Sequence, residues 1–268
     1  MKVSSLIGLA IGIAGLYLGA TLEGSNPMAV LNLPAMLIVL GGTLGATVMG
    51  TSFDSVKNIP MQYKRIFMTE APDLNAKVAE LVGYAEAARR DGLLALDEVT
   101  NTIEDPYTKK GLQLVVDGTD PDLVADILES ENSAMQKRHA AATQPFEKAG
   151  GYAPTMGIIG TVFGLIHVLG NLDQPETLGP MIAAAFIATL LGVASANVIF
   201  LPAGARLKQL SQEELHARAM IVEGILSIQA GDNPRVVQEK LITFVPPSKR
   251  PADGESVTAN SGAAKAAA

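Results

Sequence analysis

The sequence predicts an all-α, polytopic membrane protein with four transmembrane helices and a helical cytoplasmic domain. Three observations favour this fold class. Four long stretches lack any charged side chain, the Lys and Arg residues avoid two of the gaps between those stretches, and strand-like alternation of apolar and polar residues is missing. We therefore expect helices to cross a membrane four times.

The four uncharged stretches set the positions of the spans. About 20 apolar residues cross a hydrocarbon core of ~30 Å. The first stretch follows only Met1-Lys2 and lacks a convincing cleavage site, so we expect a retained span, not a secretory signal. The second contains Pro34 and several glycines, which predicts a shorter, irregular span over Leu33–Met49. The stretches are Val3–Leu22, Gly24–Phe53, Ala149–Leu172 and Thr177–Ala205.

The basic residues set the orientation. All 20 Lys and Arg lie at Lys2, between Lys57 and Lys148, or between Arg206 and Lys265. Basic residues are retained on the cytoplasmic side of a membrane. We therefore expect an inner-membrane protein with both termini and residues 51–150 in the cytoplasm.

Five segments follow from this layout. In the first domain, helices are predicted from Pro72-Asp73 to Arg90 and over Leu93–Glu104, the latter stopped by Pro106. Asp120 and Pro121 then start a long helix that leads into the third span. Later helices are predicted over Arg206–Gln229 and Pro234–Phe244. The segments are residues 1–50 (spans 1 and 2), 51–150 (cytoplasmic domain), 151–202 (spans 3 and 4), 203–245 (cytoplasmic helices) and 246–268 (disordered tail).

Composition argues against several classes of function. The chain has no cysteine, and no nucleophile–base pair or metal-ligand cluster stands out, so we expect no enzyme, no metal site and no cofactor. The net charge of −7 and the lack of a basic cluster speak against nucleic acid as a partner, which leaves membrane lipid and other proteins.

Small residues and two threonines mark the third and fourth spans. Small faces let helix backbones approach closely in lipid. Thr161 and Thr189 lie at matching depth on these helices, which suggests a narrow polar path, although packing within one subunit explains the small residues equally well. No span contains Asp, Glu, Lys or Arg, so an ion crossing here needs a carboxylate from another chain. The small faces are Gly157, Gly160 and Gly164, and Ala184, Ala188, Gly192 and Ala196.

Pro154 and Pro202 mark the cytoplasmic ends of spans three and four. Proline ends or kinks helices, so both residues can simply mark the ends of helical segments. Alternatively they are hinges, because Pro202 cannot donate a hydrogen bond to the carbonyl of Val198. Spacing alone does not choose between these interpretations.

Five motifs resemble the motility protein A family (MotA and PomA) of flagellar stators, within the wider MotA/TolQ/ExbB group. The resemblance runs in order from residue 1 to about residue 246 and includes the four-span layout. The motifs are AARRDGLLAL at 87–96, LVVDG at 114–118, YAPTMGIIGTVFGLI at 152–166, AAFIATLLG at 184–192 and EGILSI at 223–228.

The resemblance implies a stator of five copies of this chain around two copies of a MotB-like B subunit that supplies the ion-binding aspartate. It implies that Arg89, Arg90 and Glu98, with Asp97 as a weaker candidate, contact a FliG-like rotor switch protein. It also implies mechanistic roles for Pro154 and Pro202.

The resemblance further places Thr189 near the ion site, beside Ala188 and Thr161. The resemblance implies that sodium-driven members carry two consecutive threonines here, where this chain has Ala188-Thr189. Because alanine lacks the hydroxyl oxygen that could bind Na⁺ in place of water, this difference favours H⁺ over Na⁺. Thr161, however, is similar to the residue that the sodium-driven members carry at that position.

Two alternatives remain. An ExbB/TolQ-like energy transducer also couples ion flow to mechanical work, but those chains resemble three-span proteins with the N-terminus outside. A small-solute transporter would be expected to carry intramembrane charge or an inverted repeat, and neither is apparent here.

Overall fold

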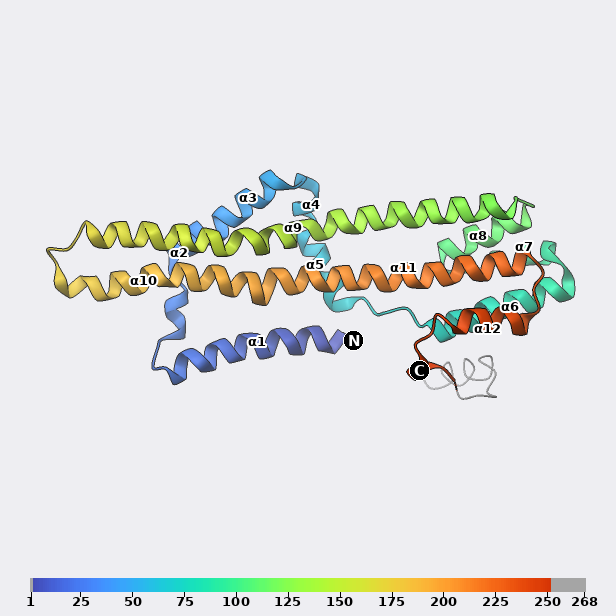
Figure 1. The fold of residues 1–268 in the computed structure, drawn as a ribbon, viewed down its shortest axis with the longest axis horizontal. Helices are drawn as coiled ribbons and strands as arrows, with labels where there is room; N and C mark the ends of the chain where they lie inside the picture. Colours follow the sequence, from blue (N-terminus) through green and yellow to red (C-terminus); the bar gives the residue numbers. More distant parts are fainter. Residues whose placement is uncertain (1, 252–268) are drawn as a thin grey trace. The chain divides into compact units, whose positions relative to one another are not determined.

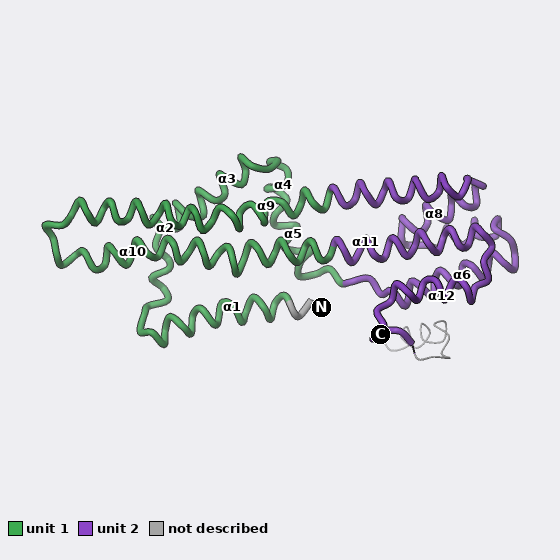
Figure 2. The backbone as a smooth tube through the Cα atoms, in the orientation of Figure 1, with its two compact units in different colours: residues 1–70, 138–210 green, residues 71–137, 211–268 purple. Residues whose placement is uncertain are grey.

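The computed structural model describes residues 2–251, with side chains from Ser5 onward. It divides into two compact units (Figure 2). Unit 1 comprises residues 1–70 and 138–210, and unit 2 comprises residues 71–137 and 211–268. Two long helices, α9 (Pro121–Leu169) and α11 (Leu201–Gln229), contribute residues to both (Figure 1). The fold class is therefore confirmed: the described chain is helical, and its four longest apolar segments have the length and hydropathy of membrane spans.

Unit 1 holds the four spans. The first is α1 (Lys2–Leu22), and α10 (Pro175–Ala194) continues through the π-helix η4 (Ser195–Phe200) into α11 as the fourth. The second consists of α2 (Leu33–Met36), the π-helix η2 (Leu37–Gly41) and α3 (Gly42–Gly50), so the predicted irregularity is present. The Asn32 side chain accepts a hydrogen bond from the Ala35 amide and caps this span. A short 3₁₀-helix, η1 (Pro27–Val30), precedes it.

Two short helices follow the second span and were not predicted. They are α4 (Phe53–Lys57), capped by Ser52, and α5 (Ile59–Met68). On α5, Ile66 is buried with Phe146 of α9 and with Leu207 of α11. The rings of Tyr63 and Phe146 meet edge to face, 5.3 Å apart. Residues 51–70 therefore pack into unit 1, whereas the sequence-based boundary placed them in the cytoplasmic domain.

Unit 2 has a core of aliphatic side chains. It contains α6 (Leu74–Asp91), η3 (Leu93–Ala95), α7 (Leu96–Thr100), α8 (Pro106–Val116), α12 (Pro234–Ile242) and parts of α9 and α11. Asp73 caps α6 by accepting hydrogen bonds from the Asn75 and Ala76 amides. Fully buried core residues include Val78, Leu81, Leu96, Leu112, Leu128, Met220, Ile225 and Leu241.

Three predictions about helix boundaries need correction. The helix expected over Leu93–Glu104 ends at Thr100, whose hydroxyl donates to the Asp97 carbonyl. Pro106 does not only stop a helix: with Asp105 as its cap, it begins α8. The tail expected to be disordered from Pro246 first forms a 3₁₀-turn, η5 (Pro247–Lys249), and the Lys249 carbonyl accepts a hydrogen bond from Asn75. Residues 252–268 lie outside the described part of the chain.

Candidate functional site

The contact between α9 and α10 brings two backbones together. A Cβ atom placed on Gly157 would lie 2.9 Å from the Ala188 carbonyl oxygen, and one on Gly164 would lie 2.9 Å from the Ala185 Cα. One placed on Gly192 would overlap the carbonyl of Ala153. The small residues of both spans therefore face each other, as the packing interpretation expects.

Thr161 and Thr189 lie within this contact. Their hydroxyl oxygens are 2.5 Å apart. The Thr161 hydroxyl is also 3.0 Å from the Ala185 carbonyl and 3.1 Å from the Gly157 carbonyl, and the Thr189 hydroxyl is 3.4 Å from the latter. Each hydroxyl carries one proton, so one threonine donates to the other, which then donates to a carbonyl. The pair places two hydroxyl groups between the two helices, and these neutral groups neither bind nor release a proton near pH 7.

Ala188 does not face this hydroxyl pair. Its side chain is 2% exposed and packs with Ala35 and Val39 of the second span. A Cβ on Gly160 would lie 2.7 Å from the Ala188 methyl group. The structure thus brings Thr161 and Thr189 together but turns Ala188 toward a packed apolar contact.

The described membrane helices provide no acid close to the threonines. The uncharged runs end at Lys148 and Asp173 on one side, and at Glu176 and Arg206 on the other. His167 is exposed and lies six residues beyond Thr161, where its backbone carbonyl accepts a hydrogen bond from Asn171. The described site therefore consists of neutral hydroxyl and carbonyl groups, which can donate and accept hydrogen bonds but carry no charge.

Both candidate hinge prolines lie inside continuous helices. Pro154 is an interior residue of α9, together with Pro145, which the sequence analysis overlooked. Pro202 is the second residue of α11, and Leu201 separates it from the π-helix η4. There the Leu201 amide bonds to the carbonyl of Ala196, five residues back. Because Pro202 has no amide hydrogen, the normal helical ladder is interrupted at this point.

The four charged candidates gather around one turn of unit 2. Arg89 and Arg90 occupy the last turn of α6, and Asp97 and Glu98 occupy the first turn of α7. Each pair has the sign that complements its helix dipole. Gly92 lies between them with φ of 86°, a conformation that favours glycine.

All four of these side chains are exposed. Arg90 contacts its neighbour Asp91, with an Nε–Oδ2 distance of 2.9 Å. This hydrogen bond raises the pKa of Arg90 and lowers the pKa of Asp91. Among the described residues, Arg89, Asp97 and Glu98 form no ion pair. The turn therefore presents both signs of charge to solvent within a short stretch.

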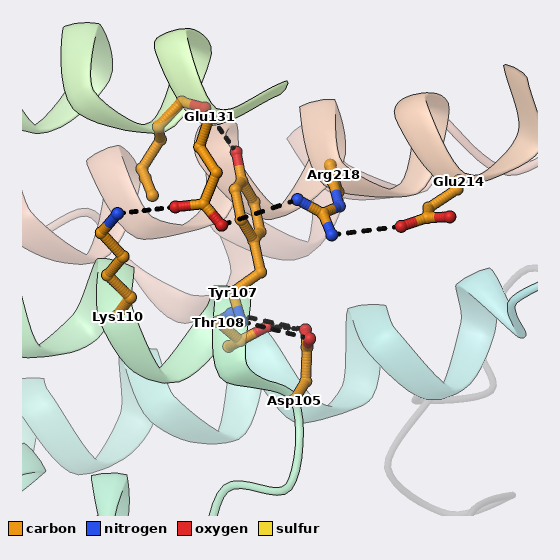
Figure 3. A network of polar contacts seen from close by, with 8 residues as sticks. Asp105, Tyr107, Thr108, Lys110, Glu131, Glu214 and Arg218 are labelled. Carbon is orange, nitrogen blue, oxygen red and sulfur yellow. Dashed lines mark hydrogen bonds and ion pairs between the residues drawn. The ribbon is translucent and has the colours of Figure 1, made fainter. Parts of the chain in front are cut away.

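A polar network in unit 2 was not predicted (Figure 3). Glu131 of α9 lies between Lys110 of α8, at 2.6 Å, and Arg218 of α11, at 3.8 Å. Arg218 also pairs with Glu214 and lies over the ring of Tyr107, 4.5 Å from its centroid. These residues are far apart in the sequence, so no local pattern could have grouped them.

Burial and hydrogen bonds shift the pKa values of Tyr107 and Asp105, which lie near this network. Burial raises the pKa of Tyr107 to about 12, and its hydroxyl donates to the Leu128 carbonyl at 3.2 Å. Burial also raises the pKa of Asp105, but donation from the Thr108 hydroxyl, the charge of Lys77 and two backbone amides outweigh it. The net result is an Asp105 pKa below the usual value.

Sequence comparisons identify relatives over the full length of the chain. A family model described as the MotA/TolQ/ExbB proton channel family matches residues 99–220. "Motility protein A" of Bacillus subtilis is 36% identical and aligns over 99% of this chain and 98% of its own length. "Chemotaxis protein PomA" of Vibrio alginolyticus is 34% identical over 93% of this chain and 96% of its own.

Solved structures agree with these relatives. The flagellar MotAB stator complex from Bacillus subtilis contains a chain with a TM-score of 0.88 and 35% identity, which matches 94% of this chain and 100% of that one. The MotAB structure from C. jejuni gives a TM-score of 0.90 and 31% identity, over 96% of this chain and 100% of that one. This chain therefore shares its fold with the matched chains of both structures over their full length.

Proposed function

The chain belongs to the motility protein A family, within the wider MotA/TolQ/ExbB proton channel family, and we propose on this basis how its parts serve a flagellar stator. The chain is a torque-generating, ion-driven stator subunit of the bacterial inner membrane. The solved relatives are complexes of MotA with MotB, so a MotB-like B subunit is the partner. The full-length motility protein A relatives favour this function over an ExbB/TolQ-like transducer or a solute transporter.

The observation that carries the proposal is the Thr161–Thr189 pair in an acid-free contact. The hydroxyls lie 2.5 Å apart between two helices whose spans contain no carboxylate. Ion transfer at membrane depth normally requires an ionisable group. In our proposal the B subunit contributes an aspartate next to Thr161 and Thr189, and the two hydroxyls orient that carboxylate or a water molecule beside it.

The proposed ion is the proton. Ala188 has no hydroxyl group, so its side chain offers no oxygen that could replace water around Na⁺, and its methyl group is packed against the second span and Gly160. A proton needs only hydrogen-bonded hydroxyls, water and an acid. The experiment is to measure swimming speed against external Na⁺ in a strain that depends on this stator. Speed that is independent of Na⁺ supports the proposal, whereas a steep rise with Na⁺ would reverse the choice of ion.

Torque is proposed to pass through the exposed charges Arg89, Arg90, Asp97 and Glu98 to a FliG-like rotor switch protein. Exposed ion pairs contribute only ~0–1 kcal/mol each, which suits contacts that form and break repeatedly. One ion crossing releases ~2.3 kcal/mol per 100 mV of membrane potential, so a single step could not break a much stronger contact.

Charge reversal at Arg90 tests the torque surface. Arg90→Glu should stop swimming and leave the amount of assembled complex unchanged, because the side chain is exposed and contacts only its neighbour Asp91 in the described structure. Arg235→Glu, an equivalent reversal on the exposed face of α12, is the control and should swim. Loss of assembly in Arg90→Glu would instead make this residue structural.

Further assignments complete the proposal. The charge asymmetry supports cytoplasmic termini and a cytoplasmic location for residues 51–150. Pro154 and Pro202 act as hinges, since each interrupts the hydrogen bonds of a long helix. Self-association into five copies would cover the apolar side chains that remain exposed on the membrane helices, among them Ile158, Phe163, Phe186 and Leu190.

A further inference from the structure

Unit 1 contains a cavity that none of the assignments above uses. It has a volume of about 490 Å³ and lies between α1, α5 and the segment from η4 to the start of α11. This volume is within the ~300–1,000 Å³ typical of ligand pockets. The cavity adjoins Pro202 and Asn197, where the helical ladder changes from π to α.

Glycines on α1 create the space. A Cβ atom placed on Gly8 would meet no other atom within 4 Å, and one on Gly12 would lie 3.3 Å from a methyl group of Val198. Ile13 and Phe67 add apolar walls. The pocket is therefore an apolar slot that a hydrocarbon chain can fill.

Polar groups occur on only a few lining positions. Ser5, Tyr63, Asn197 and Arg206 are the lining residues with polar side chains. The Asn197 amide already donates to the Val193 carbonyl at 2.9 Å. Ser5 begins the first span and Arg206 follows the fourth, and charge asymmetry assigns both ends to the cytoplasmic leaflet.

The helix α5, which forms one wall of the cavity, carries basic residues on its exposed surface. On α5, Ile66 and Phe67 face the cavity, while Lys64 and Arg65, next to them in the sequence, are exposed. Met61 and Met68 are exposed on this helix as well. A short helix with basic and apolar surfaces is typical of a segment that lies in the membrane interface. Basic pockets between transmembrane helices on the cytoplasmic side attract anionic headgroups.

We propose that this cavity binds an anionic glycerophospholipid of the cytoplasmic leaflet. One acyl chain occupies the slot beside Gly8 and Val198, and the phosphate lies near Arg206, the basic residue of the lining. The charge complementarity and the apolar walls select this occupant over a protein segment. The bound lipid would contact the helix at Pro202, but its binding depends on neither the identity of the ion nor the rotor contact.

Photolabelling of the full complex tests the site. The chain is co-purified with its B subunit in nanodiscs that contain phosphatidylglycerol with a photoreactive acyl chain. We expect label on peptides covering residues 5–13 and 197–206, and weaker labelling by the matching phosphatidylcholine probe. Replacing Arg206 by Gln should reduce phosphatidylglycerol labelling about fivefold, because one charge beside the headgroup is removed.

A pair of glycine variants provides the control. Gly8→Leu places a larger apolar side chain in the slot, whereas Gly15→Leu adds the same side chain elsewhere on α1; a Cβ atom at either position meets nothing within 4 Å. Gly8→Leu should abolish the label and Gly15→Leu should retain it, with equal yields of complex. Equal labelling of the two variants, or equal labelling by both lipids, would overturn the proposal. Leu9 also lines the cavity, so a photoreactive residue can be introduced in its place. A crosslink from this position to a second copy of the chain, and not to lipid, would also overturn the proposal.

Discussion

The two units use glycine in different ways. In unit 1, a Cβ on Gly157 or Gly192 would meet backbone atoms of the facing helix. In unit 2, a Cβ on Gly111 or Gly224 would meet side-chain atoms, chiefly those of Ile225 or Leu81. Backbones therefore touch at the α9–α10 contact of unit 1, whereas side chains interdigitate around these two glycines of unit 2. Only the first arrangement brings the hydroxyls of two short threonine side chains within hydrogen-bond distance.

The stabilising forces differ accordingly. Unit 2 buries Leu, Ile, Val and Met against water and joins its helices with ion pairs around Glu131 and Lys240. In lipid there is no such hydrophobic drive, and close van der Waals contact replaces it. The stability of unit 1, the proposed conducting part, thus depends on close packing between helices. The stability of unit 2, the proposed force-bearing part, depends on a conventional hydrophobic core.

The largest expected effect is a cavity in the unit 2 core. Leu128→Ala removes a fully buried side chain and should cost ~2–5 kcal/mol. Hydrogen exchange of the amides in α6, α8 and α12 should accelerate by ~30-fold or more, because these helices share the core. Leu123→Ala on the same helix, at a position 52% exposed, is the control. Equal acceleration in both variants would contradict the core described here.

A smaller effect separates the two kinds of glycine. Gly192→Ala should destabilise the complex by ~1–3 kcal/mol, since the added methyl group meets the Ala153 backbone. Gly111→Ala should cost less, because Ile225 can rotate away. Gly151→Ala in α9 meets nothing within 4 Å and reports the gain in helix propensity alone. The thermal midpoints of the three purified complexes test this order, and a Gly111→Ala loss equal to that of Gly192→Ala would remove the distinction.

The smallest effect concerns acid stability in unit 2. The pKa of Asp105 is lowered in the folded state, so its contribution is present above the ordinary carboxyl value of ~3.9 and is lost as the pH falls through the lower folded value. Asp105→Asn should destabilise α8 by up to ~1 kcal/mol at pH 7, and by less below pH ~4. Hydrogen exchange of residues 106–116 across this range measures the difference. A deficit that grows on acidification would mean that the pKa is raised instead.

The sequence predicted unit 1 better than unit 2. Uncharged length locates spans directly, and the spacing of three and four residues between Gly157, Gly160 and Gly164 predicted a smooth face that the structure confirms. Thr161 and Thr189, which the sequence places at matching depth, are in contact, and their role in a polar path stays a prediction. In lipid, few physical rules compete, so a simple pattern suffices.

Unit 2 required information that local patterns lack. Pro106 was interpreted as a stop, although Asp105 accepts bonds from the next amides and makes it a helix start. The network around Glu131 and Arg218 depends on how α8, α9 and α11 pack, which no local pattern specifies. In unit 1, the direction of the Ala188 side chain likewise could not be predicted from the sequence. Its neighbour Thr189 belongs to the hydroxyl pair, but the methyl group of Ala188 faces the second span.

The central claim is that this chain conducts only when a partner contributes an acid. Proton flux into vesicles, driven by an imposed membrane potential, tests it most directly. Vesicles with this chain and its B subunit should show flux, and vesicles with this chain alone should behave like empty ones. Flux through the chain alone at the rate of the two-subunit complex would contradict the account.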